Sequence, residues 1–249
     1  MILTDTDIRQ RLSTSSTSGF DETAGVGQWA NSDETILVYP FEEAQLTPVG
    51  YDLRVGAQHL SLKRKKEFEL GVGQEFSIEP GETLLVSTEE YIGLPKHNQT
   101  LVGIIESKVS LVSLGLSHVS TTVDPDWEGH LLVALTNHQS FPIKLIRRQP
   151  FCTLMFIEVK TKATKQVGRP PGRSDIILER IRAWRQAAED AQRSLLRRML
   201  PLVGFIAVVV VLTAVAYLVF GSTEGFSGWA AVTIALASVV FSEIRRGNQ

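Results

Sequence analysis

Residues 202–220 form an unbroken apolar run without a formally charged side chain, near the C-terminal end of this 249-residue chain. A helix of about 20 apolar residues crosses the roughly 30 Å hydrocarbon core of a bilayer. A second apolar stretch, residues 226–241, follows after a short loop. We therefore expect two transmembrane helices, arranged as a hairpin over residues 201–244. Because the second stretch is shorter and has Gly228 near its start, a re-entrant or interfacial segment is the alternative there.

The charges around these two stretches predict their orientation. The loop between the stretches carries only one charged residue, Glu224, and arginines flank the pair on both outer sides. Since positively charged flanks stay on the cytoplasmic side of a membrane, we expect a two-pass membrane protein whose N-terminal domain and C-terminus are both cytoplasmic. The opening sequence MILTDTDIRQRL lacks the apolar core of a secretory signal, which agrees with this orientation. The flanking arginines are Arg193, Arg197, Arg198, Arg245 and Arg246.

The segment before the apolar run divides into a linker and a helix. Residues 160–173 are basic and contain two prolines and two glycines, a composition typical of a linker. Residues 174–200 carry apolar side chains at alternating steps of four and three, which is the seam of a coiled coil. A coiled-coil stalk and an amphipathic helix lying on the membrane or on the head both fit this pattern. The seam positions are Ile177, Ile181, Trp184, Ala188, Ala191 and Leu195.

The first part of the chain has the pattern of a β-rich head. Residues 5–12 predict a short opening helix, and residues 13–27 are rich in Ser, Thr and Gly and predict a loop. From residue 36 to residue 159, short runs of β-branched and aromatic residues recur at roughly ten-residue spacing between Gly, Pro and Asn. This spacing is typical of a β-sandwich or a barrel.

Composition excludes several classes of function. The net charge of −2 gives no basic footprint for nucleic acid, so we expect no nucleic-acid partner. Cys152 is the only cysteine, and the five histidines lack the spacing of metal ligands. The sequence therefore predicts no metal site in the protein itself, and it excludes the zinc-dependent type of deaminase.

Six segments, in order, resemble the motifs of the dCTP deaminase and dUTPase superfamily, and the deaminase branch in particular. They are MILTDTDI, YPFEEAQLTPVGYDLRVG, FSIEPGETLLVSTEEYIGLP, ESKVSLVSLGL, TTVDPDWEGHLLVALTN and QPFCTLMF. The resemblance covers residues 1–159. It implies a mainly β fold, a dUTPase-like distorted β-barrel, which assembles as a homotrimer with active sites at the subunit interfaces. It also implies a deoxypyrimidine nucleotide as the ligand.

The resemblance assigns roles to particular residues. Lys108 stands at the position of a motif arginine, Ser110 keeps a motif hydroxyl, and Thr153 replaces a motif glutamine. Trp127 takes the place of the aromatic residue that stacks near the deoxyribose, and Asp124 that of the aspartate that orients the attacking water in dUTPases. The residues expected to bind nucleotide are Asp52, Lys108, Ser110, Trp127 and Thr153, with Asp124 as the catalytic residue of an active enzyme and Mg²⁺ entering with the triphosphate.

The departures from the motifs bear on activity. Ala134 stands where the deaminases carry the glutamate that acts as general base and acid, and general acid–base catalysis contributes roughly 10²–10⁴-fold. Val109 and Ser113 replace a further serine and arginine. We therefore expect a membrane-anchored protein that binds a dUTP- or dCTP-like nucleotide and has lost deaminase chemistry. The alternatives are an active Mg²⁺-dependent dUTP hydrolase of nucleotide metabolism and a trimeric membrane scaffold that binds no nucleotide.

Overall fold

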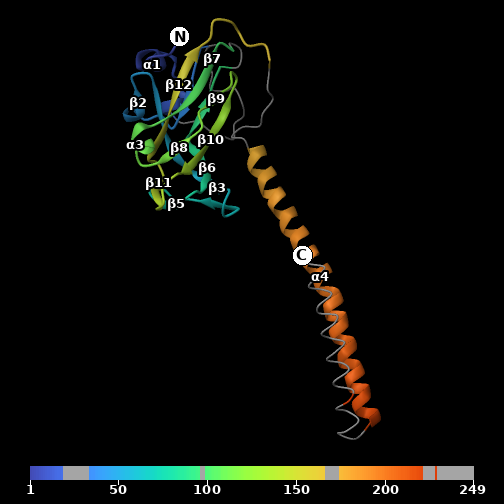
Figure 1. Cartoon of the computed structure of the whole chain (residues 1–249). Helices are drawn as coiled ribbons and strands as arrows, with labels where there is room; N and C mark the ends of the chain where they lie inside the picture. Colours follow the sequence, from blue (N-terminus) through green and yellow to red (C-terminus); the bar gives the residue numbers. More distant parts are fainter. Residues whose placement is uncertain (19–33, 96–98, 166–173, 221–227, 229–249) are drawn as a thin grey trace. The chain divides into compact units, whose positions relative to one another are not determined.

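The computed structural model describes residues 1–18, 34–95, 99–165, 174–220 and 228 of the chain (Figure 1). The chain divides into two compact units, Met1–Arg182 and Ala183–Gln249. The first unit contains all the strands of the described residues, and we refer to its residues 1–159 as the head. The head is mainly β, as the sequence predicts.

The strands of the head follow one another with short connections. The described residues form β1 (Leu37–Tyr39), β2 (Leu46–Thr47), β3 (Gly50–Ser61), β4 (Lys66–Glu69), β5 (Glu75–Ile78), β6 (Thr83–Gly93), β7 (Leu101–Ser107), β8 (Leu116–His118), β9 (Thr121–Val123), β10 (Glu128–Asn137), β11 (Ile143–Ile146) and β12 (Pro150–Glu158).

Most of these strands belong to one sheet with the order β8-β10-β6-β3-β12-β7-β9. Strand β1 also pairs with β6, β2 and β4 pair with β3, and β11 and β5 form a separate two-stranded sheet. The two ends of the order, β8 and β9, are joined in the chain by only two residues, Val119 and Ser120. Because so short a connection holds both edges of the sheet together, the sheet must curl back on itself. This agrees with the barrel expected for the head.

The core of the head lies inside the curl and is made by alternation along the strands. In β10 the side chains of Leu131, Val133 and Leu135 are buried, whereas Leu132 and Ala134 between them are only partly covered. Successive side chains of a strand point to opposite faces of a sheet, so the three buried residues face the core and Ala134 faces outward. The largest side chains that are fully enclosed are Tyr51, Phe151 and Phe156.

Short helices cap and connect the strands. Helix α1 (Asp5–Arg11) begins at a capping box, in which Thr4 and Asp7 bond each other's backbone N–H groups, and it confirms the predicted opening helix. Helix α2 (Ser15–Ser18) lies in the segment predicted to be a loop, which is a correction; most of that segment is outside the described residues. A 3₁₀ turn, η1 (Glu43–Gln45), leads into β2.

Residues 110–116 (SLVSLGL) belong to the predicted series of β runs, but of these residues only Leu116 lies in a strand. Residues Val109–Val112 form helix α3, because the carbonyl of Lys108 accepts hydrogen bonds from the N–H groups of Leu111 and Val112. Gly115 then adopts a φ of +83°, which favours glycine, and turns the chain into β8. A tertiary position at the end of β7 therefore overrides the β-like composition.

A single helix, α4 (Ser174–Phe220), occupies the C-terminal part of the described residues. The predicted helix 174–200 and residues 201–220 of the predicted hairpin are thus parts of one continuous helix. Pro201 lies inside this helix and lacks the N–H that would donate to the carbonyl four residues earlier. No helix in the described part of the chain combines the length and hydropathy that a membrane crossing requires. The second predicted span, apart from Gly228, and residues 166–173 of the predicted linker lie outside the described residues.

Candidate functional site

Three of the residues expected to bind nucleotide meet where β3, β12 and the end of β7 lie together. Thr153 of β12 faces Asp52 of β3 in the ladder, and its Oγ1 donates a hydrogen bond of 2.6 Å to Asp52 Oδ1. Lys108, which directly follows β7, donates from its Nζ to the other carboxylate oxygen, Oδ2. We call Asp52, Lys108 and Thr153 the Asp52 group. The strand order therefore joins residues that are 101 positions apart in the chain.

The Asp52 group is open to solvent on one side. The side chain of Lys108 is 24% exposed and that of Asp52 is 14% exposed. Its positive and negative charges balance, so an anion that enters must compete with Asp52 for the ammonium group. Lysine can make this exchange because its charge lies at the end of a flexible chain.

Ser110 lies beside this group in sequence but is not part of its hydrogen bonds. It is exposed on α3, and its carbonyl accepts a bond of 3.0 Å from Ser113 Oγ. The structure therefore places Ser110 on the surface next to the Asp52 group, where its hydroxyl faces solvent within this chain.

Asp124 and Trp127 lie in the turn between β9 and β10. The N–H of Trp127 donates to the carbonyl of Asp124 at 3.2 Å, and its indole Nε1 donates to the carbonyl of Gly129 at 3.1 Å. The Trp127 ring is half-buried and packs against the core of the head. Asp126 between them has a φ of +69°, which tightens the turn.

The turn and the Asp52 group are far apart within one chain. Strand β9 runs antiparallel to β7, with Val123 opposite Gly103 and Thr121 opposite Ile105. Asp124 thus lies near the start of β7, whereas Lys108 follows its end. At about 3.3 Å per residue, the six positions between these points span about 20 Å. One chain alone does not bring the predicted residues into a single site.

Ala134 occupies the outward face of β10. It lies opposite Leu85 of β6 in the ladder, and its neighbour Thr136 on the same face shares a hydrogen bond of 3.0 Å with Thr83. A methyl group at this point of the strand cannot transfer a proton.

A separate cleft has a volume of about 550 Å³. Strands β1, β3, β4, β6 and β10 contribute to its lining, and the turn between β11 and β12 supplies two arginines. The polar lining residues include Gln58, Ser87, Glu89, Arg147 and Arg148. Its volume lies within the range of small-molecule sites, which is about 300–1,000 Å³.

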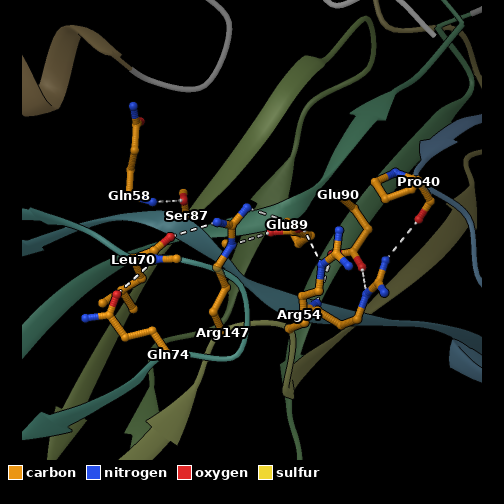
Figure 2. Close-up of polar contacts among 12 residues, drawn as sticks. Pro40, Arg54, Gln58, Leu70, Gln74, Ser87, Glu89, Glu90 and Arg147 are labelled. Atoms are coloured by element: carbon orange, nitrogen blue, oxygen red, sulfur yellow. Dashed lines mark hydrogen bonds and ion pairs between the residues drawn. The ribbon is translucent and has the colours of Figure 1, made fainter. Parts of the chain in front are cut away.

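Glu89 organises the charges in this cleft. Arg147 Nε donates to Glu89 Oε2 at 3.1 Å, and Arg148 Nε donates to Glu89 Oε1 at 2.8 Å. Burial favours the neutral carboxyl, but the hydrogen bonds from Arg148 and Arg147 outweigh it and hold the pKa of Glu89 below its ordinary value. Figure 2 shows Arg147 reaching between Glu89 and Leu70, whose carbonyl accepts from Nη1 at 2.7 Å.

The next residue of β6, Glu90, points to the opposite face and enters the core. Its Oε1 accepts from Arg54 Nε at 2.5 Å, and its Oε2 accepts from the backbone N–H of Arg54 at 2.8 Å (Figure 2). Arg54 Nη2 also donates to the carbonyl of Pro40 at 3.1 Å. Burial raises the pKa of Glu90, although the bonds from Arg54 lower it. This buried pair joins β3 to β6 beneath the cleft.

Neither the cleft nor the buried pair was predicted from the sequence. Arg54 and Glu90 stand in two of the motif segments, but nothing in their spacing indicates that they meet. The adjacent arginines Arg147 and Arg148, just before a strand, are the one signal that could have pointed to the cleft.

Comparisons with known proteins support the resemblance at the level of the family. A family model described as dCTP deaminase-like matches residues 28–159. The dCTP deaminase of Metallosphaera sedula is 34% identical over 137 residues, which are 51% of this chain and 77% of that protein. The dCTP deaminase of Pyrococcus furiosus is 33% identical over 128 residues, which are 51% of this chain and 79% of that protein.

Two further similarities come from a virus and from a crystal structure. A probable deoxyuridine 5'-triphosphate nucleotidohydrolase of Sulfolobus islandicus rod-shaped virus 1 is 30% identical over 134 residues, covering 54% of this chain and 81% of that protein. The crystal structure of the 2'-deoxycytidine 5'-triphosphate deaminase of Agrobacterium tumefaciens aligns with a TM-score of 0.44 and 17% identity. That alignment covers 62% of this chain and 47% of the other, so this chain spans less than half of it.

Proposed function

Because the chain belongs to the dCTP deaminase-like family, we propose that its head binds a deoxypyrimidine nucleotide of the dUTP or dCTP type without deaminating it. The observation that carries the proposal is the Asp52 group, in which Asp52 of β3 and Thr153 of β12 meet Lys108, the residue after β7. The relatives named as dCTP deaminases and as a dUTP nucleotidohydrolase support the class of ligand.

In this proposal Lys108 binds the phosphates. Its ammonium is partly exposed and is held by Asp52, and a triphosphate offers it several negative oxygens in exchange. Lysine acts here as a point charge, without the planar fork of arginine, so the interaction has one strong contact and little directional demand. Thr153 remains bonded to Asp52 and keeps the carboxylate in place when Lys108 turns to the ligand.

The site is shared between copies of the chain. The turn with Asp124 and Trp127 lies about 20 Å along β7 from Lys108, so one chain supplies only half of the expected contacts. A homotrimer, in which the turn of one subunit meets the Asp52 group of the next, accounts for both halves. Trp127 then covers the sugar while Lys108 and Ser110 of the other subunit hold the phosphates.

Loss of deamination rests on Ala134. Attack of water on a cytosine ring needs a group that removes and returns a proton, and alanine has none. Ala134 is only partly covered on the outward face of β10, so the position is free to face a ligand while contributing no catalysis.

Mg²⁺ fits the Asp52 group as a companion of the nucleotide. Mg²⁺ bound with phosphates takes one or two carboxylates and keeps several waters, and Asp52 is the single carboxylate in the group. Asp52 would hold it, and the ion would neutralise phosphate charge. The same donor set is too small for a resident metal without the triphosphate.

A second candidate function is hydrolysis of dUTP with release of pyrophosphate. Two observations favour it: the viral relative named as a probable dUTP nucleotidohydrolase, and Asp124 at the position of the aspartate that orients water. In that case Asp124 accepts a hydrogen bond from the attacking water, and Lys108 stabilises the charge on the phosphates.

We also propose that the C-terminal region attaches the head to a membrane, with both chain ends on the cytoplasmic side. Support comes from the uncharged run at 202–220 and from the arginines that flank residues 201–244. Protease protection tests this orientation in sealed vesicles whose cytoplasmic face is outward. Protection of the head, or of the C-terminus, in these vesicles contradicts it.

Thermal unfolding of the full chain with dUTP, dCTP, dTTP or dUMP and Mg²⁺ tests nucleotide binding, because a ligand of the folded state raises Tm. We expect a triphosphate to raise Tm and Lys108→Ala to weaken its binding by about tenfold to a hundredfold, the value of one hydrogen bond to a charged group. Lys66→Ala, which removes an exposed cation of β4, is the matched control. If no nucleotide shifts Tm, only the non-binding scaffold remains.

Pyrophosphate release separates the two candidate functions. The binding protein releases none above background, and ammonia release from dCTP is also absent. Hydrolysis of dUTP that disappears in Asp124→Asn establishes the enzyme, whereas hydrolysis that survives this change removes Asp124 from the mechanism.

A further inference from the structure

The cleft around Glu89, Arg147 and Arg148 has no part in the proposed nucleotide site, and its construction points to a ligand of its own. It lies between β1, β3, β6 and β10, whereas the Asp52 group lies where β3 meets β12 and the end of β7. A ligand in this cleft therefore does not depend on the proposed function.

The guanidinium donors of Arg147 are used within the chain. Nε and Nη2 bond Glu89 at 3.1 and 3.5 Å, and Nη1 bonds the carbonyl of Leu70 at 2.7 Å. Arg147 is thus a structural part of the wall. It neutralises Glu89, whose side chain is only 8% exposed.

Arg148 makes fewer hydrogen bonds than Arg147. Its Nε bonds Glu89 at 2.8 Å, and in the part of the chain that the structure describes this is the only hydrogen bond of its guanidinium group. The side chain is 46% exposed and lines the cleft, so its guanidinium group is accessible to a ligand. Two parallel donors on a fixed plane match the two oxygens of a carboxylate or a phosphate.

The backbone at Arg148 adopts an unusual conformation for a residue with a side chain. Its φ is +72°, in the left-handed region that favours glycine and disfavours a side chain with a β-carbon. The turn is held there because the N–H of Arg148 donates to Val55 at 2.9 Å and the N–H of Arg147 donates to Gln74 at 3.0 Å. A glycine would satisfy the turn without strain. Strain kept for the sake of a side chain commonly accompanies a functional role.

The charged groups that line the cleft do not all cancel. Arg147, Arg148 and Glu89 together carry one formal positive charge, and Glu90 on the opposite face is matched by Arg54. Glu69 also lines the cleft, but its side chain is exposed and solvent screens its charge. Gln58 and Ser87 add polar groups to the lining.

From these contacts, the backbone conformation and the charges we infer that the cleft is a binding site for a small polar molecule carrying one oxyanion group, a phosphate or a carboxylate. Arg148 binds this group with its two terminal amino groups. Glu89 acts as the positioning residue that fixes the plane of the guanidinium. Arg147 and the clamped turn between β11 and β12 hold that arrangement in place.

Thermal unfolding and calorimetric titration of the full chain test the site, with inorganic phosphate in one arm, citrate in the other and sodium chloride at equal ionic strength as reference. We expect at least one of the two anions to raise Tm, and Arg148→Ala to weaken its binding at least tenfold. Arg9→Ala is the matched control, because Arg9 is as exposed as Arg148 (47%) and also pairs with a carboxylate. Which arm responds distinguishes a phosphate from a carboxylate ligand.

Two more variants keep the test independent of folding. Arg148→Gly relieves the strained φ, so it should leave Tm without anion no lower than that of the parent while losing the response to the anion. Arg148→Lys keeps the charge but not the fork, and should bind measurably more weakly than the parent.

Three outcomes would overturn the site, and the first is that neither anion shifts Tm of the parent. The second is a shift that survives Arg148→Ala but is lost in Lys108→Ala, which would place the anion at the Asp52 group. The third is a change in the mass of the assembly in Arg148→Ala, which would make the cleft an interface between subunits. The second outcome would support the proposed nucleotide site, so the two proposals fail separately.

Discussion

The head and helix α4 are stabilised in opposite ways. In the head, large apolar side chains such as Phe156 and Leu154 are fully enclosed, and charged residues such as Glu90 are enclosed with a partner. Along the described part of α4, many apolar side chains from Leu195 onward are exposed within the chain, Leu218 at 81%. The head satisfies itself through contacts between distant residues, whereas α4 is held by bonds between residues four apart.

This difference teaches where the chain depends on partners. A folded head needs nothing else to cover its core. A helix with a long row of exposed apolar residues needs another surface, because exposed apolar patches of this extent are covered in functioning proteins. Lipid, other copies of α4 and the second predicted span are the covers consistent with our proposals.

The largest effect should come from breaking the buried pair of the head. Arg54→Ala leaves the Glu90 carboxylate enclosed without its main partner, and we expect a loss of about 3–5 kcal/mol in the free energy of unfolding of the head. Near-ultraviolet circular dichroism during urea unfolding measures the head, and the signal at 222 nm follows α4. Loss of both signals at one urea concentration would break the comparison, and Arg9→Ala is the control.

Acid should destabilise the head through His59. Burial lowers the pKa of His59 from 6.5 to about 4, so the unfolded chain takes up a proton at a pH where the folded head does not. Stability is complete above about pH 6.5 and falls as the pH drops toward 4, by roughly 3 kcal/mol from this group.

Substitution His59→Gln isolates that contribution. The glutamine amide can still donate to the carbonyl of Gly56, as His59 Nε2 does at 3.0 Å, but it does not titrate. The variant should lose less stability between pH 6.5 and 4 than the parent. Since residues 174–220 contain no histidine, a histidine-like midpoint in the α4 signal would contradict this assignment.

The smallest effects come from one substitution made in both regions. In Gly56→Ala the new β-carbon would lie 2.5 Å from the carbonyl oxygen of Thr88, so we expect a loss of about 1–3 kcal/mol in the head. In Gly204→Ala nothing lies within 4 Å, and α4 should gain about 0.5–1 kcal/mol. Urea unfolding of both variants measures the two changes. A loss in Gly204→Ala would sharpen the comparison differently, by showing that another helix packs against this point.

Much of the fold could be predicted because it is encoded locally. Runs such as TLLVSTEEYIG and HLLVALTN became β6 and β10, since their β-branched residues and alternation suit a half-buried strand. Helix α1 followed from Thr4 and Asp7. The differences at α2 and α3 fall on segments where neighbouring contacts outweighed the local signal.

The candidate site was predictable only through its resemblance to known motifs. That resemblance named Asp52, Lys108 and Thr153, but it did not show that Lys108 is held by Asp52, or that Asp124 lies about 20 Å away in the same chain. The cleft at Arg148 was not predicted, because its charge balance depends on Glu89, which is 59 positions earlier in the chain.

Local composition therefore determined the β-rich nature of the head, the helical nature of residues 174–220 and the family to which the motifs point, since periodicity and side-chain type act over a few neighbouring residues. Only the tertiary structure decided which charges meet. Pairing of Glu90 with Arg54, of Glu89 with Arg148 and of Asp52 with Lys108 depends on the order of strands in the curled sheet, and that order arises from burial of the whole core at once.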